Sequence, residues 1–144
     1  MPIANTVIHT MQHKLPKVVD ARTHGVIDYC HAAFFLGLAW YYRKSEPRAA
    51  LAAAVTGGFV LVQSLLTDYP LGAAKVIPFE THGRMDSAFA GASLMMPRLF
   101  GFEGTAASKI FKSNGFVEAS VVGMTNWNNE GARAEEHGLL AKAS

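Results

Sequence analysis

The feature that most constrains this chain is a six-residue motif that occurs twice, each time at the start of an apolar stretch. The motif at residues 23–28, Thr-His-Gly-Val-Ile-Asp, returns 58 residues later at residues 81–86 as Thr-His-Gly-Arg-Met-Asp. A second match, Gly-Phe-Val at residues 58–60 and 115–117, has an offset of 57 residues. Two such matches predict a duplicated structural unit. The predicted boundaries are 23–69 for repeat one and 81–127 for repeat two.

Four apolar stretches predict four helices, two in each repeat. They cover approximately residues 25–42, 48–66, 83–102 and 106–126. A helix needs about 20 mainly apolar residues to cross a membrane, and 50% of this chain is hydrophobic while 17% is charged. The fourth stretch contains Lys109, Lys112, Asn114 and Glu118, so we expect other helices or a partner subunit to cover its polar face.

These stretches predict an all-α fold, a four-helix transmembrane bundle built from a duplicated two-helix repeat. Small residues recur within the stretches and allow close helix packing in a bilayer, while aromatic residues gather at the ends, as in an interfacial belt. Each repeat holds an even number of spans, so both copies should run the same way, related by a parallel pseudo-two-fold axis. Residues 1–22 form a polar N-terminal segment and residues 128–144 a polar tail. A soluble helical bundle is the alternative.

Charge and motif content exclude several classes of function. The formal net charge of +2 is too mild, and the basic residues too scattered, for a nucleic-acid surface. Cys30 is the only cysteine of the chain, so no intrachain disulfide and no thiolate metal cluster can form. The sequence contains no nucleophile elbow, phosphate-binding glycine loop or zinc-protease helix. Enzyme activity therefore has no positive support, and the residues identify no cofactor.

The repeated motif has a local explanation as a helix start. Thr or His would cap the helix, and Asp in the first turn would face the free N–H groups. His24 and Asp28 are four residues apart, as are His82 and Asp86, so each pair shares one helix face. We expect these four residues to serve as helix caps and as a polar network between the repeats.

Three segments carry a family resemblance. RTHGVIDY at residues 22–29, SLLTDYPLGAAKVIPFETHGRMD at residues 64–86 and PRLFGF at residues 97–102 resemble the SPW-repeat family of small bacterial integral membrane proteins. The resemblance covers roughly residues 21–125, and its most specific part is the connector Thr67-Asp68-Tyr69. It implies a four-span protein of a bacterial inner (cytoplasmic) membrane, in contact with lipid, and it brings no established activity.

Several polar residues are candidates for a functional site. His24, Asp28 and His31 fall on one helix face, where two imidazoles and a carboxylate would suit a transition metal or haem. Residue 89, which corresponds to His31 in the second repeat, is phenylalanine, so we favour the structural role for the histidines. Glu118 and Gln63 lie at nearly corresponding positions of the second helices, where polar groups at membrane depth often serve ions or protons.

Three hypotheses for function follow. The leading one is a structural or accessory role, as a subunit that packs against itself or a larger membrane complex. The second is a small transporter or ion or proton conductor that uses the acidic residues and histidines. The third is a haem- or metal-binding membrane protein.

Overall fold

The part of the chain that the structure describes is all-α apart from two very short strands. The computed structural model describes residues 15–128, 137–138 and 140–142, so most of the predicted N-terminal segment and polar tail lie outside the described residues. The described part contains four long helices and one two-stranded parallel sheet. Their bounds are α2 Ala21–Tyr42, α3 Pro47–Leu66, β1 Thr67–Asp68, β2 Ile77–Pro78, α4 Phe79–Leu99 and α5 Ala106–Met124.

Helices α2 and α4 begin four residues before the apolar stretches that predicted them. Asp20 is the N-cap of α2, and its Oδ1 accepts a hydrogen bond from the Thr23 backbone N–H at 2.7 Å. That bond lowers the pKa of the Asp20 carboxyl. Pro78 precedes α4 and has no N–H to satisfy. The predicted capping role of His24, Asp28, His82 and Asp86 is therefore wrong, because the caps lie upstream and the motif lies within the first two helical turns.

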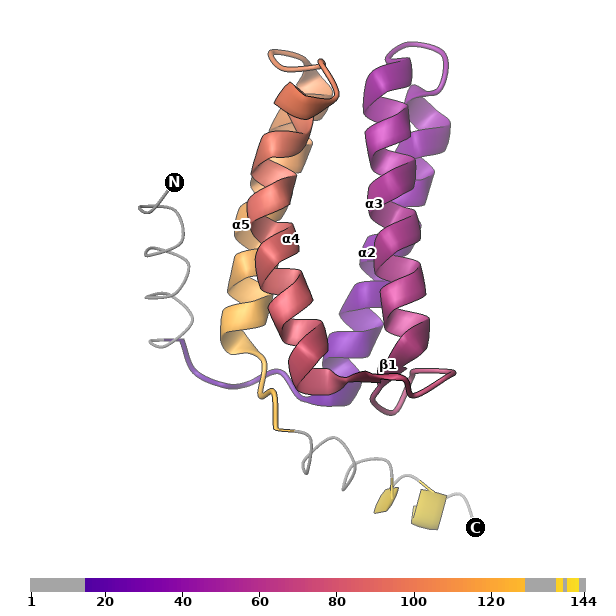
Figure 1. The fold of residues 1–144 in the computed structure, drawn as a ribbon, viewed down its shortest axis with the longest axis vertical. Helices are drawn as coiled ribbons and strands as arrows, with labels where there is room; N and C mark the ends of the chain where they lie inside the picture. Colours follow the sequence, from indigo (N-terminus) through magenta and orange to yellow (C-terminus); the bar gives the residue numbers. More distant parts are fainter. Residues whose placement is uncertain (1–14, 129–136, 139, 143–144) are drawn as a thin grey trace.

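The helices form two antiparallel pairs, α2 with α3 and α4 with α5. In Figure 1, α2 and α4 start at the same end of the molecule, and the two pairs lie close together there and diverge toward the opposite turns. Between the diverging helices, Phe35 of α2 meets Phe111 of α5 edge to face, with ring centroids 5.1 Å apart. Small residues complete this core, namely Ala49, Ala52, Ala53 and Ala107.

In each helix pair, a glycine of the second helix lies against the backbone of the first. A side chain at Gly57 would lie 2.9 Å from the Ala32 carbonyl oxygen, and one at Gly115 would lie 2.8 Å from the Ala90 carbonyl oxygen. Both glycines and both contacted residues are 58 apart. The sequence match that aligned Gly58 with Gly115 is thus one residue out of register, because Gly58 faces open space. Helix backbones can approach this closely only where the side chain is absent.

Two backbone pairings connect the helix pairs at the end where α2 and α4 begin. Thr67 of β1 pairs with Ile77 of β2, and an isolated bridge joins Val19 to Thr125. The segment that precedes α2 thus lies beside the segment that follows α5. The segment that precedes α4 lies beside the segment that follows α3. Both pairings bring a threonine next to the start of a motif helix.

The outer faces of the helices are apolar, whereas much of the interior is polar. Large apolar side chains are exposed along the helices, including Phe34, Leu51, Val55, Phe59, Val62, Phe116 and Val117. Buried residues include His24, Asp28, Thr56, Gln63, Ser64, His82, Asp86, Ser93 and Glu118. Among the described residues one helix, α3, is long and apolar enough by itself to cross a membrane.

Candidate functional site

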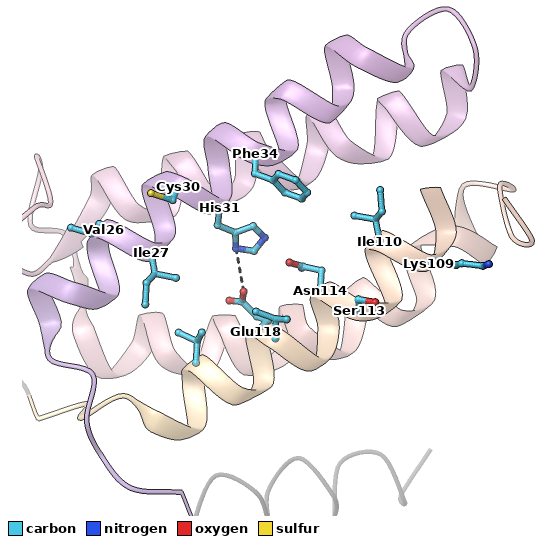
Figure 2. Close-up of a pocket in the computed structure, with 12 residues that line it drawn as sticks. Val26, Ile27, Cys30, His31, Phe34, Lys109, Ile110, Ser113, Asn114 and Glu118 are labelled. Atoms are coloured by element: carbon cyan, nitrogen blue, oxygen red, sulfur yellow. Dashed lines mark ion pairs between the residues drawn. The ribbon is translucent and has the colours of Figure 1, made fainter. Parts of the chain in front are cut away.

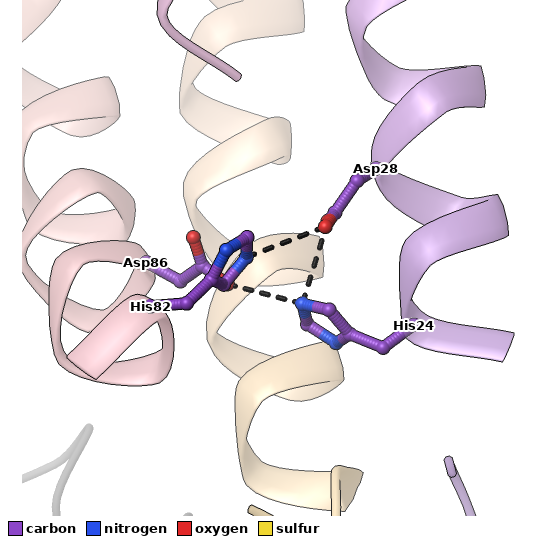
Figure 3. A group of neighbouring side chains, drawn as sticks. All are labelled: His24, Asp28, His82 and Asp86. Carbon is purple, nitrogen blue, oxygen red and sulfur yellow. Dashed lines mark hydrogen bonds and ion pairs between the residues drawn. The ribbon is translucent and has the colours of Figure 1, made fainter. Parts of the chain in front are cut away.

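The two copies of the motif meet in one buried cluster, which we call the His–Asp centre: His24 and Asp28 of α2 with His82 and Asp86 of α4 (Figure 3). The His24 Nε2 atom lies 3.1 Å from Asp86 Oδ2 and 3.4 Å from Asp28 Oδ1. The His82 Nε2 atom lies 3.0 Å from Asp86 Oδ2 and 3.3 Å from Asp28 Oδ2. Each imidazole therefore faces both carboxylates, one from its own helix and one from the other pair.

Two threonines determine which ring nitrogen carries a proton. Thr67 Oγ1 lies 2.6 Å from His82 Nδ1, and Thr125 Oγ1 lies 2.9 Å from His24 Nδ1. Each hydroxyl also donates to the backbone carbonyl four residues earlier, at 2.7 Å. A hydroxyl has one proton to donate, so each threonine must accept from an Nδ1–H group. Each Nε2 atom faces the carboxylates and can take a further proton or a metal ion, and His24 Nε2 is within hydrogen-bond distance of Asp86 Oδ2.

The carboxylates also have outer partners. Gln63 Nε2 donates to Asp86 Oδ1 at 2.6 Å, so Gln63, a candidate from the sequence, belongs to this centre. Tyr69 donates its hydroxyl to Asp28 Oδ2 at 3.4 Å. Burial, together with the nearby Asp28 carboxylate, raises the pKa of the Tyr69 phenol. The phenol therefore remains a donor. Such outer partners fix the orientation of side chains that hold a metal.

Two aromatic residues cover the centre, and the motif glycines make room for them. Trp127 packs on the His24 ring at 4.7 Å between centroids, and Tyr69 lies 5.9 Å from the His82 ring. A Cβ atom at Gly25 would lie 2.7 Å from the Tyr69 ring, and one at Gly83 would lie 2.6 Å from the Trp127 ring. The glycine of each motif thus gives an aromatic ring access to the helix backbone.

Sequence reasoning missed Thr125 and Trp127 as members of the centre. The available signal was their spacing, because Thr125 follows Thr67 and Trp127 follows Tyr69 by 58 residues, the offset of the motif itself. The connector residues Thr67 and Tyr69 contact the centre, whereas Asp68 is half-buried within β1.

His31 does not join the His–Asp centre. Seven residues of helix separate His31 from His24, which is about 10 Å along the axis, too far for both rings to bind one ion. His31 Nδ1 instead lies 3.2 Å from Glu118 Oε2 of α5. The metal-binding face considered for His24, Asp28 and His31, beside the favoured structural role, is therefore not formed: His24 and Asp28 instead meet His82 and Asp86 of a second helix.

Glu118 pairs with His31 and not with a nearby cation. Lys112 and Arg84 each pair with another glutamate on the surface. The side chains of His31 and Glu118 are only 10% and 9% exposed. Beside this pair lies a cavity of about 670 Å³ between α2 and α5 (Figure 2). The structure thus separates the sequence candidates into two sites, the His–Asp centre and the His31–Glu118 pair.

The imidazole–carboxylate distances of the His–Asp centre are close to those between the ligand atoms of a metal site. Ligand atoms about 2.0–2.1 Å from a tetrahedral ion lie roughly 3.3–3.4 Å from one another. The four distances between imidazole nitrogen and carboxylate oxygen range from 3.0 to 3.4 Å, and one ligand atom from each residue lies within 4.8 Å of all the others. Two nitrogens and two carboxylate oxygens form a donor set that suits zinc and similar divalent ions.

Comparison with known proteins adds no functional assignment to this geometry. No family model, no curated protein and no solved structure matches the chain.

Proposed function

We propose that this chain is an integral membrane protein in which the His–Asp centre binds one divalent transition metal ion of the zinc class and thereby joins two copies of a helix pair. The observation that carries the proposal is the orientation of the two buried imidazoles. Each has its Nδ1–H group bound to a threonine and its Nε2 atom directed toward two buried carboxylates.

Electrostatics requires a positive species between these groups. An imidazole protonated only at Nδ1 presents a lone pair at Nε2, which repels a carboxylate oxygen. Two further protons or one divalent cation would neutralise the two carboxylates. His82 Nε2 is buried and makes no hydrogen bond of normal geometry, although carboxylate oxygens lie 3.0 and 3.3 Å away. A proton on His82 Nε2 would form only poorly aligned ion pairs with these oxygens, whereas a metal ion between the four ligands would use the lone pair directly. We therefore favour the metal.

The distribution of polarity supports a membrane location. In a protein surrounded by water, charged side chains are rarely buried and large apolar patches rarely exposed. Here Asp28, Asp86 and Glu118 are buried, while Phe34 and Phe116 are 53% and 64% exposed. Lipid would solvate the apolar exterior, and the polar groups would find their partners within the protein.

The arrangement of the ligands favours a structural role for the metal. Four protein ligands close a tetrahedral site, whereas catalytic sites keep a position open. Two ligands come from α2 and two from α4, so the ion would hold the helix pairs together at the end where they meet. This role agrees with the structural or accessory function expected from the sequence.

Purification from native membranes tests both parts of the proposal. We expect the chain to stay in the membrane pellet after an alkaline wash. The detergent-purified protein should contain about one divalent metal ion per chain, and cobalt introduced after chelation should give the visible absorption of a tetrahedral complex. Release by the wash would contradict the membrane location. Protein that stays metal-free after incubation with zinc and cobalt would contradict the metal site.

Thr67 gives a test of the orientation argument. In Thr67→Val a methyl group replaces the hydroxyl that accepts from His82 Nδ1, and we expect roughly 10- to 100-fold weaker zinc affinity. Thr67→Ser keeps the hydroxyl and serves as the control. Thr125→Val should behave like Thr67→Val, because Thr125 contacts His24 in the same way. Affinity measured by competition with a zinc-binding dye decides the matter, and unchanged affinity in both valine variants would refute the assigned protonation.

A further inference from the structure

The His31–Glu118 pair breaks the correspondence between residues 58 apart. At the 58-residue offset of the motif, the positions that correspond to His31 and Glu118 are Phe89 and Val60, so Gln63, three residues further on, is not the counterpart of Glu118. Phe89 and Val60 belong to one apolar cluster, and Phe89 stacks on Phe59 with ring centroids 5.2 Å apart. Apolar packing thus occupies the α3–α4 side, whereas a buried ionisable pair and a cavity occupy the α2–α5 side. The ionisable pair is thus present on only one of the two corresponding sides of the described helices, and it needs its own explanation.

One atom of the pair lacks a partner. His31 Nδ1 contacts Glu118, but the buried Nε2 atom of the same ring has no hydrogen-bond partner among the described residues. Figure 2 shows that the ring nitrogen away from Glu118 points toward the side of the cavity where Ile110 and Asn114 lie. A buried polar atom without a partner is unfavourable, so a ligand in the cavity that bonds to this atom would be stabilised.

The walls of the cavity indicate an elongated apolar ligand. The volume of about 670 Å³ lies within the roughly 300–1,000 Å³ typical of small-molecule sites. Apolar side chains from both helices line it, including Val26, Ile27 and Phe34 of α2 and Ile110 and Val117 of α5. In a bilayer such a cavity lies within reach of lipid chains.

The chemistry of the pair indicates the head group. His31 and Glu118 can balance each other's charge, so a charged head would bring an uncompensated charge into a buried site. A hydroxyl group can donate to a bare Nε2 atom or accept from an Nε2–H group, and therefore satisfies His31 in either protonation state. Lys109 also lines the cavity but is exposed, so it does not require a buried anion.

We propose that the cavity between α2 and α5 binds a neutral single-chain lipid whose hydroxyl head bonds to His31. The proposal rests on the membrane location proposed above, and it does not depend on the metal.

Photo-crosslinking tests this site in the purified, metal-loaded protein. The probe is a monoacylglycerol that carries a diazirine in its acyl chain, and peptide mass spectrometry locates the label. We expect label on the cavity-lining parts of α2 and α5, and unlabelled monoolein should reduce it at least fivefold. Methyl oleate, which has no hydroxyl, and oleate, which is anionic, should each reduce it less than twofold. Equal competition by methyl oleate would overturn the role of the hydroxyl, and stronger competition by oleate would overturn the neutral head.

A matched pair of variants separates the site from the fold. His31→Phe with Glu118→Val places on the α2–α5 side the residues found at the corresponding positions of the α3–α4 side, and it should reduce the competed labelling to background. Phe89→Leu changes the opposite side and should keep the labelling. Metal content is measured on the same samples. If the unaltered protein is labelled but holds no metal, the His–Asp centre alone is contradicted. If the double variant holds metal and is labelled as strongly as the unaltered protein, the lipid site alone is overturned.

Discussion

His82→Ala will remove the metal from the protein and strongly lower its stability. The substitution deletes one of the four proposed ligands and leaves the buried Asp28 and Asp86 carboxylates with His24 as their one remaining imidazole partner in the centre. Removing one partner of a buried ion pair typically costs about 3–5 kcal/mol. We expect the metal content to fall from about one ion per chain to near zero, and the unfolding midpoint in detergent to fall with it.

Two further variants show which effect dominates. His137 lies on an exposed part of the chain, so His137→Ala should keep both metal and stability. Adding Asp86→Asn to His82→Ala removes one of the uncompensated charges. This double variant should recover part of the lost stability without recovering the metal. If His82→Ala retains a full equivalent of metal, the assignment of the ligands is wrong.

Gly57→Val will separate α2 from α3, whereas Gly58→Val will leave them together. A Cβ atom at Gly57 would lie 2.8 Å from the Leu36 side chain and 2.9 Å from two backbone atoms, so the helices would have to move apart. Overpacking of this kind costs roughly 1–3 kcal/mol, and contact with backbone places this site at the upper end. Gly58 has nothing within 4 Å, and surface changes of that kind usually stay within about 0.5 kcal/mol.

Reversible unfolding in mixed micelles measures both glycine variants. Gly115→Val should resemble Gly57→Val, since Gly115 meets the Ala90 carbonyl oxygen at 2.8 Å. Equal losses in Gly57→Val and Gly58→Val would mean that helix propensity, rather than close packing, determines the cost.

The sequence predicts the helices best where apolar residues run without interruption. The second stretch, expected at residues 48–66, is α3 Pro47–Leu66, and the all-α class is confirmed. The apolar stretches predict the starts of α2 and α4 four residues too late, because Asp20 and Pro78, which precede these helices, lie outside the stretches. Capping is local chemistry that hydropathy does not detect.

The candidate site is only half visible in the sequence. Duplication identifies the four His and Asp residues of the centre, because their spacing recurs. Thr125 and Trp127 are missed because their role depends on the backbone pairing of Val19 with Thr125, a contact between distant parts of the chain. The partner of Glu118 is missed for the same reason, since His31 lies on another helix pair.

Several expectations stay predictions. These are the SPW-repeat resemblance, the bacterial inner membrane, the accessory role with partner subunits, and ion or proton conduction. Conduction would use the same buried Glu118 that we place beside the lipid cavity. The double variant His31→Phe with Glu118→Val can therefore also be used to measure ion or proton flux in liposomes.

Each threonine of the centre contacts the histidine of the other helix pair, and this has a consequence for the assembly of the protein. Thr67, which directly follows the first helix pair, contacts His82 of the second pair. Thr125, which directly follows the second pair, contacts His24 of the first. Neither half therefore contains a complete set of ligands with their orienting hydroxyls. Tight metal binding would then require that both helix pairs are inserted and docked against each other. A chain with one pair inserted, or with the pairs wrongly placed, would not retain the ion and would lack the stability that the ion provides.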